Sequence, residues 1–226
     1  MIDIHTHLLP NIDDGSQSIE ESVFMSKEEV KNLVTDAICT PHMRLNVFTP
    51  KKEEVINSYN KLKEALTKQN IPLNLHLGWE LHHSDDVIKQ NEVDSYVYNG
   101  KNVVLLEFKN DEEDGVEICY KYIKKGYKVI LAHVERYDYI IDDYDELKNL
   151  GVMFQVNAES VVGKSIFKCV KRVKKLLKLG YVDFVASDIH YTRTNQMLKA
   201  KIKIEKKYGT EVANKLFIEN AKKVLL

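Results

Sequence analysis

Two histidines lie one residue apart near the start of the chain. In the segment MIDIHTHLLPNIDDGS, His5 and His7 follow a short apolar run, and the acidic pair Asp13 and Asp14 follows His7 after a short interval. Side chains alternate between the two faces of a strand, so both imidazoles are expected on one side, where they can bind the same ion. Taken alone, an H-x-H pair at a strand end is weak evidence, because such histidines often have structural roles.

Short apolar runs rich in β-branched residues recur along the chain and predict seven strands. They lie at residues 2–4, 36–39, 73–77, 103–106, 129–132, 152–156 and 183–186. Amphipathic patterns between them predict helices at 19–34, 51–69, 113–125 and 161–179, with a helical end at 195–226. Gly126 and Gly180 follow two of these helices, as capping glycines do. This alternation, without a linker, predicts one α/β domain over residues 1–226 with a parallel sheet.

Side chains that can bind a metal follow six of the seven predicted strands. They are His5 and His7, His42, Glu80, Glu107, His133, and finally Asp188 with His190. Glu107 and His133 come after the strongly apolar runs VVLL and VILA, where an unpaired charge is costly. The carboxyl ends of parallel strands converge on one face of a barrel or open sheet. The pattern therefore predicts a metal cluster on that face.

Composition excludes several classes of protein. Thirty-three basic and 34 acidic side chains give a net charge of -1, so no overall field attracts nucleic acid or an anionic membrane. Three widely spaced cysteines, Cys39, Cys119 and Cys169, argue against a disulfide framework and for a reducing compartment. The start of the chain has no signal peptide pattern, and no apolar run is long enough to span a membrane. These observations predict a cytoplasmic protein without membrane insertion or a nucleic-acid partner.

The motifs resemble those of the polymerase-and-histidinol-phosphatase (PHP) superfamily, and within it the metal-dependent tyrosine phosphatases of bacterial capsular and exopolysaccharide operons. The matching stretches run in order along nearly the whole chain: MIDIHTHLLPNIDDGSQSIEES, CTPH, GWEL, VVLLEF, GYKVILAHVERY, FQVNAES, DFVASDIH and KLFIENAKKVL. H-x-H is shared with amidohydrolases, but H-x-H followed by DDG, AHVERY and ASD-x-H is far more specific for the capsular phosphatases.

The resemblance implies a distorted seven-stranded (β/α) TIM-like barrel that holds three divalent ions. Manganese is the first candidate, and iron, zinc and magnesium are alternatives, because imidazole and carboxylate ligands do not fix the element. By the same resemblance, His5, His7 and Asp188 hold one ion, and Glu80 bridges it to a second. Glu107 and His133 complete the second site, and Asp14, His42 and His190 hold the third. The strand ends had already indicated eight of these nine ligands, whereas Asp14 rests on the resemblance alone.

The implied activity is hydrolysis of phosphotyrosine on a protein, with the tyrosine-rich tail of a bacterial tyrosine kinase as the substrate. Clustered ions activate a bridging water and neutralise charge on the transferring phosphoryl group. Arg136 lies three residues after His133 and can offer a planar fork to phosphate oxygens; the alternative is a surface salt bridge. Arg193 is a second candidate for this role. His42 is counted with these two arginines among the candidate catalytic residues.

Other readings remain open. A cysteine phosphatase needs C-x5-R, whereas Cys39 and Arg44 give C-x4-R, so that mechanism is disfavoured. The alternatives are a small-molecule phosphoesterase similar to histidinol-phosphate phosphatase, and a metal-binding regulatory module without turnover. His76 is expected to be structural. His82 and His83 are expected to line the cleft or to cap it.

Overall fold

Nine short parallel strands form the centre of the described part of the chain. The structure is a computed structural model and describes residues 1–90, 92–98, 100–109 and 114–225. They are β1 (Ile2–Thr6), β2 (Asp36–Cys39), β3 (His42–Met43), β4 (Asn74–Leu77), β5 (Glu80–His82), β6 (Val103–Glu107), β7 (Lys128–Leu131), β8 (Met153–Asn157) and β9 (Val182–Ala186). One sheet has the order β1-β2-β4 and the other β3-β5-β6-β7-β8-β9. A parallel bridge from Thr6 to Ile189 joins β1 to the segment after β9.

Two of the predicted strands, at 36–39 and 73–77, are each followed by a further short strand that was not predicted. β3 follows β2 after Thr40 and Pro41, and β5 follows β4 after Gly78 and Trp79. Pro41 has no N–H to offer to a neighbouring strand. The pairing nevertheless continues, because Gly78 N donates to the Cys39 carbonyl (2.9 Å) and Glu80 N donates to the Pro41 carbonyl (3.1 Å). These two further strands account for nine strands in place of seven.

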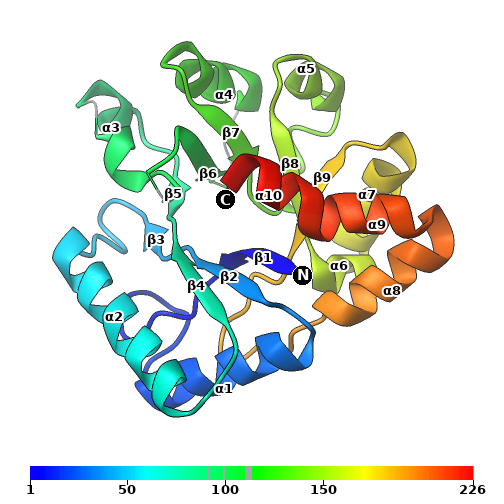
Figure 1. Cartoon of the computed structure of the whole chain (residues 1–226). Coiled ribbons are helices and arrows are strands. Elements are labelled where there is room, and N and C mark those ends of the chain that lie inside the picture. Colours follow the sequence, from blue (N-terminus) through cyan, green and yellow to red (C-terminus); the bar gives the residue numbers. More distant parts are fainter. Residues whose placement is uncertain (91, 99, 110–113, 226) are drawn as a thin grey trace.

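Helices surround the strands (Figure 1). The α-helices are α1 (Ile19–Lys31), α2 (Lys52–Lys68), α3 (Asp85–Lys89), α4 (Gly115–Lys124), α5 (Tyr144–Asn149), α6 (Ala158–Val162), α7 (Phe167–Leu179), α8 (Met197–Tyr208), α9 (Thr210–Asn214) and α10 (Asn220–Leu225). Shorter helical turns are η1 (Val93–Tyr96), η2 (Val134–Arg136) and η3 (Lys215–Glu219). Among the described residues, no helix has the length and apolar character needed to cross a membrane.

Most predicted helices agree with these bounds. Gly126 and Gly180 have φ of +93° and +71°, as their predicted capping role requires. The predicted helix at 161–179 is instead two helices, α6 and α7, because Gly163 ends α6 with φ of +94°. Positions 113 and 226, at the limits of two other predicted helices, lie outside the described residues.

Alternation along the strands determines which side chains reach the site. Apolar side chains of β6 and β9, such as Leu105 and Phe184, pack together in the barrel interior. Glu107 lies two residues beyond Leu105 on the same face of β6. Asp188 likewise follows Phe184 and Ala186 in steps of two residues beyond β9. The interior is therefore apolar until the strands end, where ligand side chains take the next inward positions.

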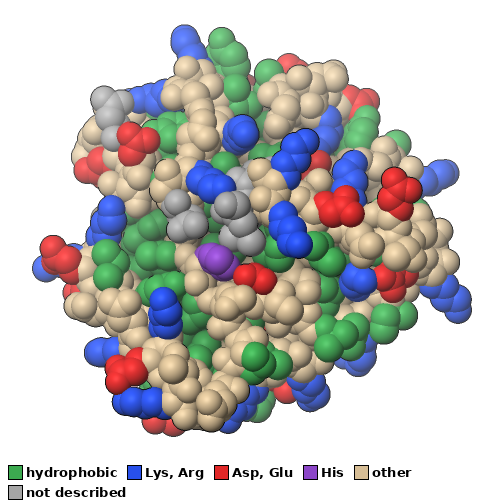
Figure 2. Space-filling view, in the orientation of Figure 1, with side chains coloured by type: hydrophobic (Ala, Val, Ile, Leu, Met, Phe, Trp, Pro, Cys, Tyr) green, Lys and Arg blue, Asp and Glu red, His purple; other side chains and the backbone are tan. Residues whose placement is uncertain are grey.

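The C-terminal helix α10 covers the opposite end of the barrel. Ala221 of α10 is buried with Ile2 and Phe184, and Asn220 donates to the Asp183 carbonyl (2.8 Å). In Figure 1, α10 crosses in front of the strands near the N-terminus of the chain. Figure 2 shows this face, where Lys and Arg side chains are spread among Asp and Glu side chains. The carboxyl ends of the strands, which carry the candidate ligands, are thus at the other end of the barrel.

The loop after β1 folds back against His7 at Gly15. Asn11 N donates to the Ser16 carbonyl (2.9 Å), and Gly15 N donates to Asp13 Oδ1 (3.0 Å). A Cβ atom at position 15 would lie 2.3 Å from the His7 backbone oxygen and 2.4 Å from the His7 Cβ. Only glycine allows this approach without a shift of the loop or of His7.

Gly15→Ala is therefore expected to lower the free energy of unfolding by roughly 3 kcal/mol, since a rigid backbone contact must be displaced. The matched control is Gly180→Ala, where the added methyl group meets nothing within 4 Å and only the left-handed backbone is penalised. That control should cost roughly 1 kcal/mol. Urea denaturation followed by circular dichroism measures both, and equal losses would contradict the close-approach argument.

Candidate metal centre

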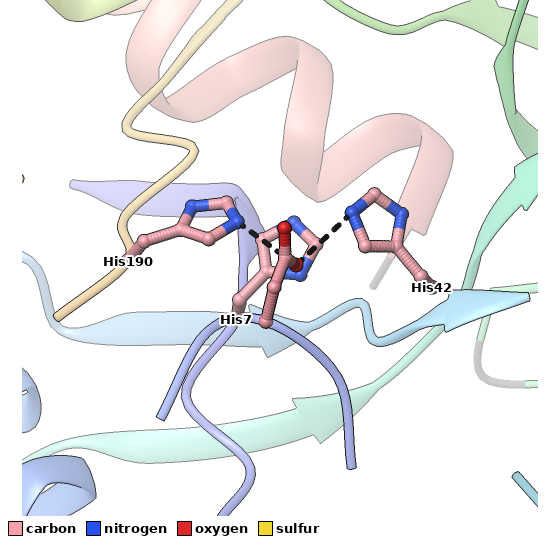
Figure 3. Close-up of side chains that lie close together, drawn as sticks. His7, His42 and His190 are labelled. Carbon is pink, nitrogen blue, oxygen red and sulfur yellow. Dashed lines mark ion pairs between the residues drawn. The ribbon is translucent and has the colours of Figure 1, made fainter. Parts of the chain in front are cut away.

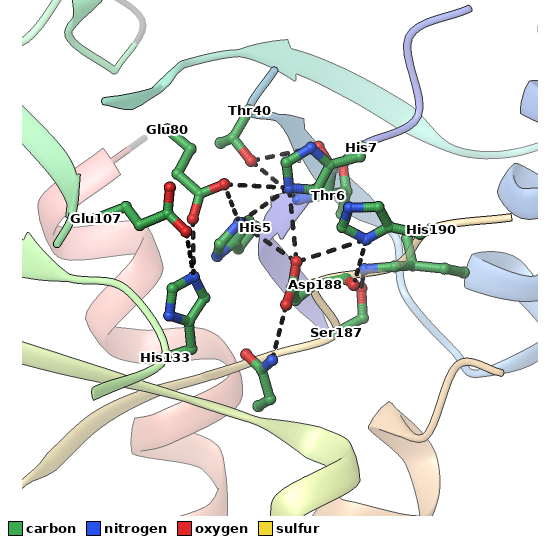
Figure 4. Close-up of polar contacts among 12 residues, drawn as sticks. His5, Thr6, His7, Thr40, Glu80, Glu107, His133, Ser187, Asp188 and His190 are labelled. Atoms are coloured by element: carbon green, nitrogen blue, oxygen red, sulfur yellow. Dashed lines mark hydrogen bonds and ion pairs between the residues drawn. The ribbon is translucent and has the colours of Figure 1, made fainter. Parts of the chain in front are cut away.

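The structure brings all nine candidate ligands together at the carboxyl ends of the strands. Their paired nitrogen and oxygen atoms lie within 4 Å of one another in a continuous chain of contacts. Figure 4 shows how the side chains around Glu80 and Asp188 converge. The members are His5, His7, Asp14, His42, Glu80, Glu107, His133, Asp188 and His190. His42 and Glu80 are register partners in β3 and β5, which explains how ligands distant in sequence become neighbours.

The innermost group is formed by His5 and His7. Their Nε2 atoms are 3.1 Å apart, and Glu80 Oε2 lies 3.2 Å and 3.3 Å from them. Asp188 Oδ1 lies 3.6 Å from His5 Nε2 and 3.5 Å from His7 Nε2. Two imidazole nitrogens and two carboxylate oxygens thus lie close together in the buried part of the site.

A second group extends from Glu80 toward β6 and β7. Glu80 Oε1 lies 2.9 Å from His133 Nε2, and Glu107 Oε1 lies 3.7 Å from the same nitrogen. His42 Nδ1 is 2.9 Å from Glu80 Oε2. The two oxygens of Glu80 therefore face different groups, which is the arrangement expected of a bridging carboxylate.

The third group lies nearest to solvent. The Asp14 carboxylate is between His42 and His190, with Oδ1 3.5 Å and 3.4 Å from their Nε2 atoms (Figure 3). The rings of His7 and His190 stack with centroids 4.2 Å apart, which ties this group to the first. Asp14 is the most exposed of the nine, with 56 % of its side chain accessible.

The chemistry of these donors fits divalent cations. Burial, reinforced by Glu80, raises the pKa of Glu107 to about 7, as expected for carboxylates that lack a compensating cation. Glu80 Oε2 and Glu107 Oε2 are buried and accept no hydrogen bond from any described residue. Burial and Arg136 lower the pKa of His133 to about 4, so this imidazole is neutral at pH 7 and keeps a free lone pair. Unsatisfied carboxylate oxygens beside a neutral imidazole suit a hard or borderline metal ion.

Three polar residues that the sequence did not single out orient the ligands. Asp13 accepts from His7 Nδ1 (2.8 Å) and from the His42 backbone N–H (3.0 Å). Gln155 Oε1 lies 3.1 Å from His5 Nδ1, and Asn157 Nδ2 donates to Asp188 Oδ2 (2.8 Å). Gln155 and Asn157 come from β8, the strand for which no ligand was predicted. The signal that could have found them is their place at a strand end, in FQVNAES, but amides do not bind metals as readily as charged groups.

Both candidate arginines contact a ligand. Arg136 donates to Asp188 Oδ2 (2.6 Å), and Arg193 donates to the same oxygen (2.8 Å). Burial opposes ionisation of Asp188, but Arg136 and His5 outweigh it and hold the pKa well below its usual range. Oδ2 is thus occupied by donors, while Oδ1 faces the imidazoles. The ion pair of Arg136 is with a buried carboxylate, so it is not a pair on the open surface.

Asp188 and His133 also have unusual backbones. Their φ angles are +51° and +32°, in the left-handed region that non-glycine residues seldom adopt. Such conformations persist where the surroundings enforce them, and they cluster at functional sites. Here they turn each side chain toward the ligand cluster as the strand ends.

The cysteines and the remaining histidines lie apart from this cluster. All three cysteines are buried and unpaired, and burial with Asp13 raises the pKa of Cys39 to about 12. His76 lies 3.2 Å from Asp36 on β2. His82 and His83 line a neighbouring cavity of 760 Å³, and burial lowers their pKa values to about 4. The structure thus provides no reactive thiolate among the described residues.

Comparison with known proteins agrees with this geometry. The family model for capsular polysaccharide synthesis proteins CpsB/CapC matches residues 1–226. The chain is 28 % identical to the tyrosine-protein phosphatase CpsB of Streptococcus agalactiae, with coverage of 100 % of the chain and 98 % of the relative. It is 31 % identical to the putative tyrosine-protein phosphatase CapC of Staphylococcus aureus, covering 100 % and 91 %.

Solved structures show the same relationship. A chain from the crystal structures of YwqE from Bacillus subtilis and CpsB from Streptococcus pneumoniae, described as unique metal-dependent tyrosine phosphatases, superposes with a TM-score of 0.90. It is 29 % identical, with coverage of 100 % of this chain and 94 % of that one. The lactonase Lmo2620 from Listeria monocytogenes has a TM-score of 0.64 at 10 % identity, covers 100 % and 94 %, and shares the fold alone. The chain belongs to the CpsB/CapC family of capsular polysaccharide synthesis proteins.

Proposed function

We propose that this protein hydrolyses phosphotyrosine on a protein substrate in a metal-dependent reaction. The observation that carries the proposal is the convergence of nine imidazole and carboxylate side chains at one end of the barrel. Family membership supports it, since the curated relatives are named tyrosine-protein phosphatases. The buried cysteines support it too, because a thiolate mechanism has no nucleophile here.

The three groups of ligands suit three divalent ions, with manganese as the first candidate. His5, His7 and Asp188 would hold the first, Glu80 would bridge to the second beside Glu107 and His133, and Asp14, His42 and His190 would hold the third. When bound, such ions supply a hydroxide nucleophile at neutral pH and neutralise phosphoryl charge. A phenolate leaves with a pKa of about 10, so the protein needs less general-acid assistance than for an alkyl phosphate.

The residues of the chain itself orient the reaction. Asn157 and both arginines hold Asp188 by Oδ2, which leaves Oδ1 directed toward His5 and His7. We assign to Arg136 and Arg193 the binding of phosphate oxygens by their other N–H groups, because a guanidinium has five donors and each is at least 32 % exposed. His42 joins the Glu80 and Asp14 groups and completes the candidate catalytic set.

The wider setting follows from the same proposal. We infer a single domain over residues 1–226, a barrel in which β2 with β3 and β4 with β5 each count once to give seven strands, and action in the cytoplasm. The proposed partner is a bacterial tyrosine kinase whose tyrosine-rich tail is dephosphorylated during capsule or exopolysaccharide synthesis. The family's link to capsular polysaccharide synthesis supports this partner.

The first prediction concerns the substrate. Apoprotein loaded in turn with manganese, iron, zinc or magnesium is expected to release phosphate from phosphotyrosine peptides and much more slowly from phosphoserine peptides. Preference for histidinol phosphate would favour the small-molecule phosphoesterase. Tight metal binding with no turnover of any substrate would favour the regulatory module. The measurement is kcat/KM for each substrate at matched metal content.

The second prediction separates metal from thiol chemistry. Chelation should abolish activity, and addition of the metal should restore it, whereas thiol alkylation should leave activity largely intact. Because the three thiols are buried and react slowly, Cys39→Ala provides the control that does not depend on reagent access. Loss of activity in Cys39→Ala with retained metal content would refute the metal mechanism.

The third prediction distinguishes a ligand from a phosphate-binding arginine. Glu80→Ala is expected to lose both bound metal and activity, since Glu80 contacts two groups of donors. Arg136→Ala is expected to lower kcat by roughly 100-fold while most of the metal is retained at saturating concentration. Arg172→Ala removes a nearby guanidinium that donates to the Glu135 carbonyl, and serves as the matched control. Metal content by elemental analysis is compared with kcat, and equal loss of both in Arg136→Ala would recast Arg136 as support for Asp188 only.

A further inference from the structure

A hollow of 480 Å³ lies beside the metal centre, between η2 and the start of α7. Its lining residues are Arg136, Asp138, Ser165, Ile166, Lys168 and Cys169. Arg136 is shared with the metal centre, because the same side chain donates to Asp188 Oδ2 (2.6 Å). If Arg136 binds the phosphate of a phosphotyrosine, the peptide residues on either side of that phosphotyrosine are within reach of this hollow.

Two consecutive large apolar side chains are exposed here, and the first of them lines the hollow. Ile166 is 58 % exposed and lines it, and Phe167, the next residue, is 83 % exposed. Phe167 has the greatest exposed fraction of the large apolar side chains in the described part of the chain. Neighbouring apolar side chains exposed next to a catalytic site are typical of a binding surface.

The charged groups around the hollow are largely paired with each other. Lys168 donates to Asp138 (2.8 Å), and Arg172 also pairs with Asp138. Cys169, which is buried, adds a weakly polar side chain to the lining of the hollow. Lys168 and Arg172 thus share one carboxylate, and the apolar contact that the hollow offers a ligand is with Ile166.

The cavity beside His82 and His83 has a different character. It is larger, at 760 Å³, and charged side chains from both signs dominate its lining, among them Arg44, Asp85 and Lys121. Asp85 and Lys121 pair at 3.0 Å. Its exposed large apolar side chain is Val47, with 57 % of its surface accessible. Val47 thus provides a matched comparison on the other cavity.

We propose that the hollow at Ile166 binds an apolar side chain that flanks the phosphotyrosine of a peptide substrate. The inference rests on the proposed function and adds a substrate class to it: phosphotyrosine next to a large aliphatic or aromatic residue. Phosphate contacts at Arg136 fix the phosphotyrosine, and contact with Ile166 and Phe167 selects the neighbouring residue. A small aryl phosphate has no such neighbour and does not use this surface.

The test compares two sets of phosphotyrosine peptides in the metal-loaded full chain. Each set differs only in having leucine or glycine immediately before or immediately after the phosphotyrosine. At one of the two positions, leucine is expected to raise kcat/KM roughly tenfold over glycine, the scale at which apolar pockets discriminate. In Ile166→Ala this ratio should fall toward one, and Phe167→Ala should reduce it in the same direction. Activity on p-nitrophenyl phosphate should be unchanged in both variants, because they leave the metal centre intact.

Val47→Ala is the control and should keep the leucine-to-glycine ratio of the unaltered protein. The inference is overturned if both Ile166→Ala and Phe167→Ala keep the leucine-to-glycine ratio of the unaltered protein. It is also overturned if Val47→Ala, and not these two variants, lowers the ratio to one. A ratio of one in the unaltered protein also overturns it. Failure of the proposed function would look different: neither p-nitrophenyl phosphate nor any phosphotyrosine peptide would be hydrolysed, and the inference would then fall with its premise.

Discussion

The constraint on which the rest of this structure depends is the burial of carboxylates at the end of an apolar barrel. Removing an ionised carboxylate from water costs several kcal/mol unless partners replace the lost hydration. Glu80 and Asp188 are both buried. Asp188 accepts hydrogen bonds from two arginines and Asn157, whereas ring nitrogens of His5, His42 and His133 lie within 3.2 Å of the Glu80 carboxylate. Glu107, whose pKa is raised, shows where compensation is incomplete. The cluster is thus arranged around negative charge that additional cations would balance.

The barrel satisfies this constraint through strand geometry. Parallel strands end on one face of the barrel. Every second side chain faces the interior, so Glu107 and Asp188 take the inward positions just beyond the last apolar interior residues of β6 and β9. Left-handed backbones at His133 and Asp188 complete the turn into the site. Gly15 allows the loop that carries Asp13 and Asp14 to lie directly against His7. Each feature is locally unfavourable or restrictive, and each places a ligand or its orienting partner.

Much of this arrangement can be predicted from the sequence, because His, Asp and Glu residues that follow predicted strands can be recognised without a structure. Eight of the nine clustered ligands were predicted from their positions after strands, and the parallel topology explains why they meet. Spacing alone did not choose between Asp13 and Asp14, and the resemblance pointed to Asp14. In the structure the two adjacent carboxylates face different partners: Asp13 faces His7 Nδ1, and Asp14 lies between His42 and His190. Gln155 and Asn157 were missed because uncharged amides carry no metal signal. The short strands β3 and β5 were missed because runs of two and three residues are too short to show the alternation of a strand.

The two oxygens of Asp188 have a consequence for how the protein meets its ligands. Because Oδ2 pairs with both Arg136 and Arg193, one carboxylate offsets part of the charge of two guanidinium groups before any phosphate arrives. The side chains alone give a net charge of -1, so long-range attraction of a dianion would come from the divalent ions proposed for the site. Without these ions, encounter with a phosphorylated protein would depend on ordinary diffusion and short-range fit; with them, it would also depend on ionic strength. In this proposal, selectivity among phosphorylated proteins comes from contacts made after collision, where the shape of the site and the apolar surface at Ile166 determine which protein remains bound.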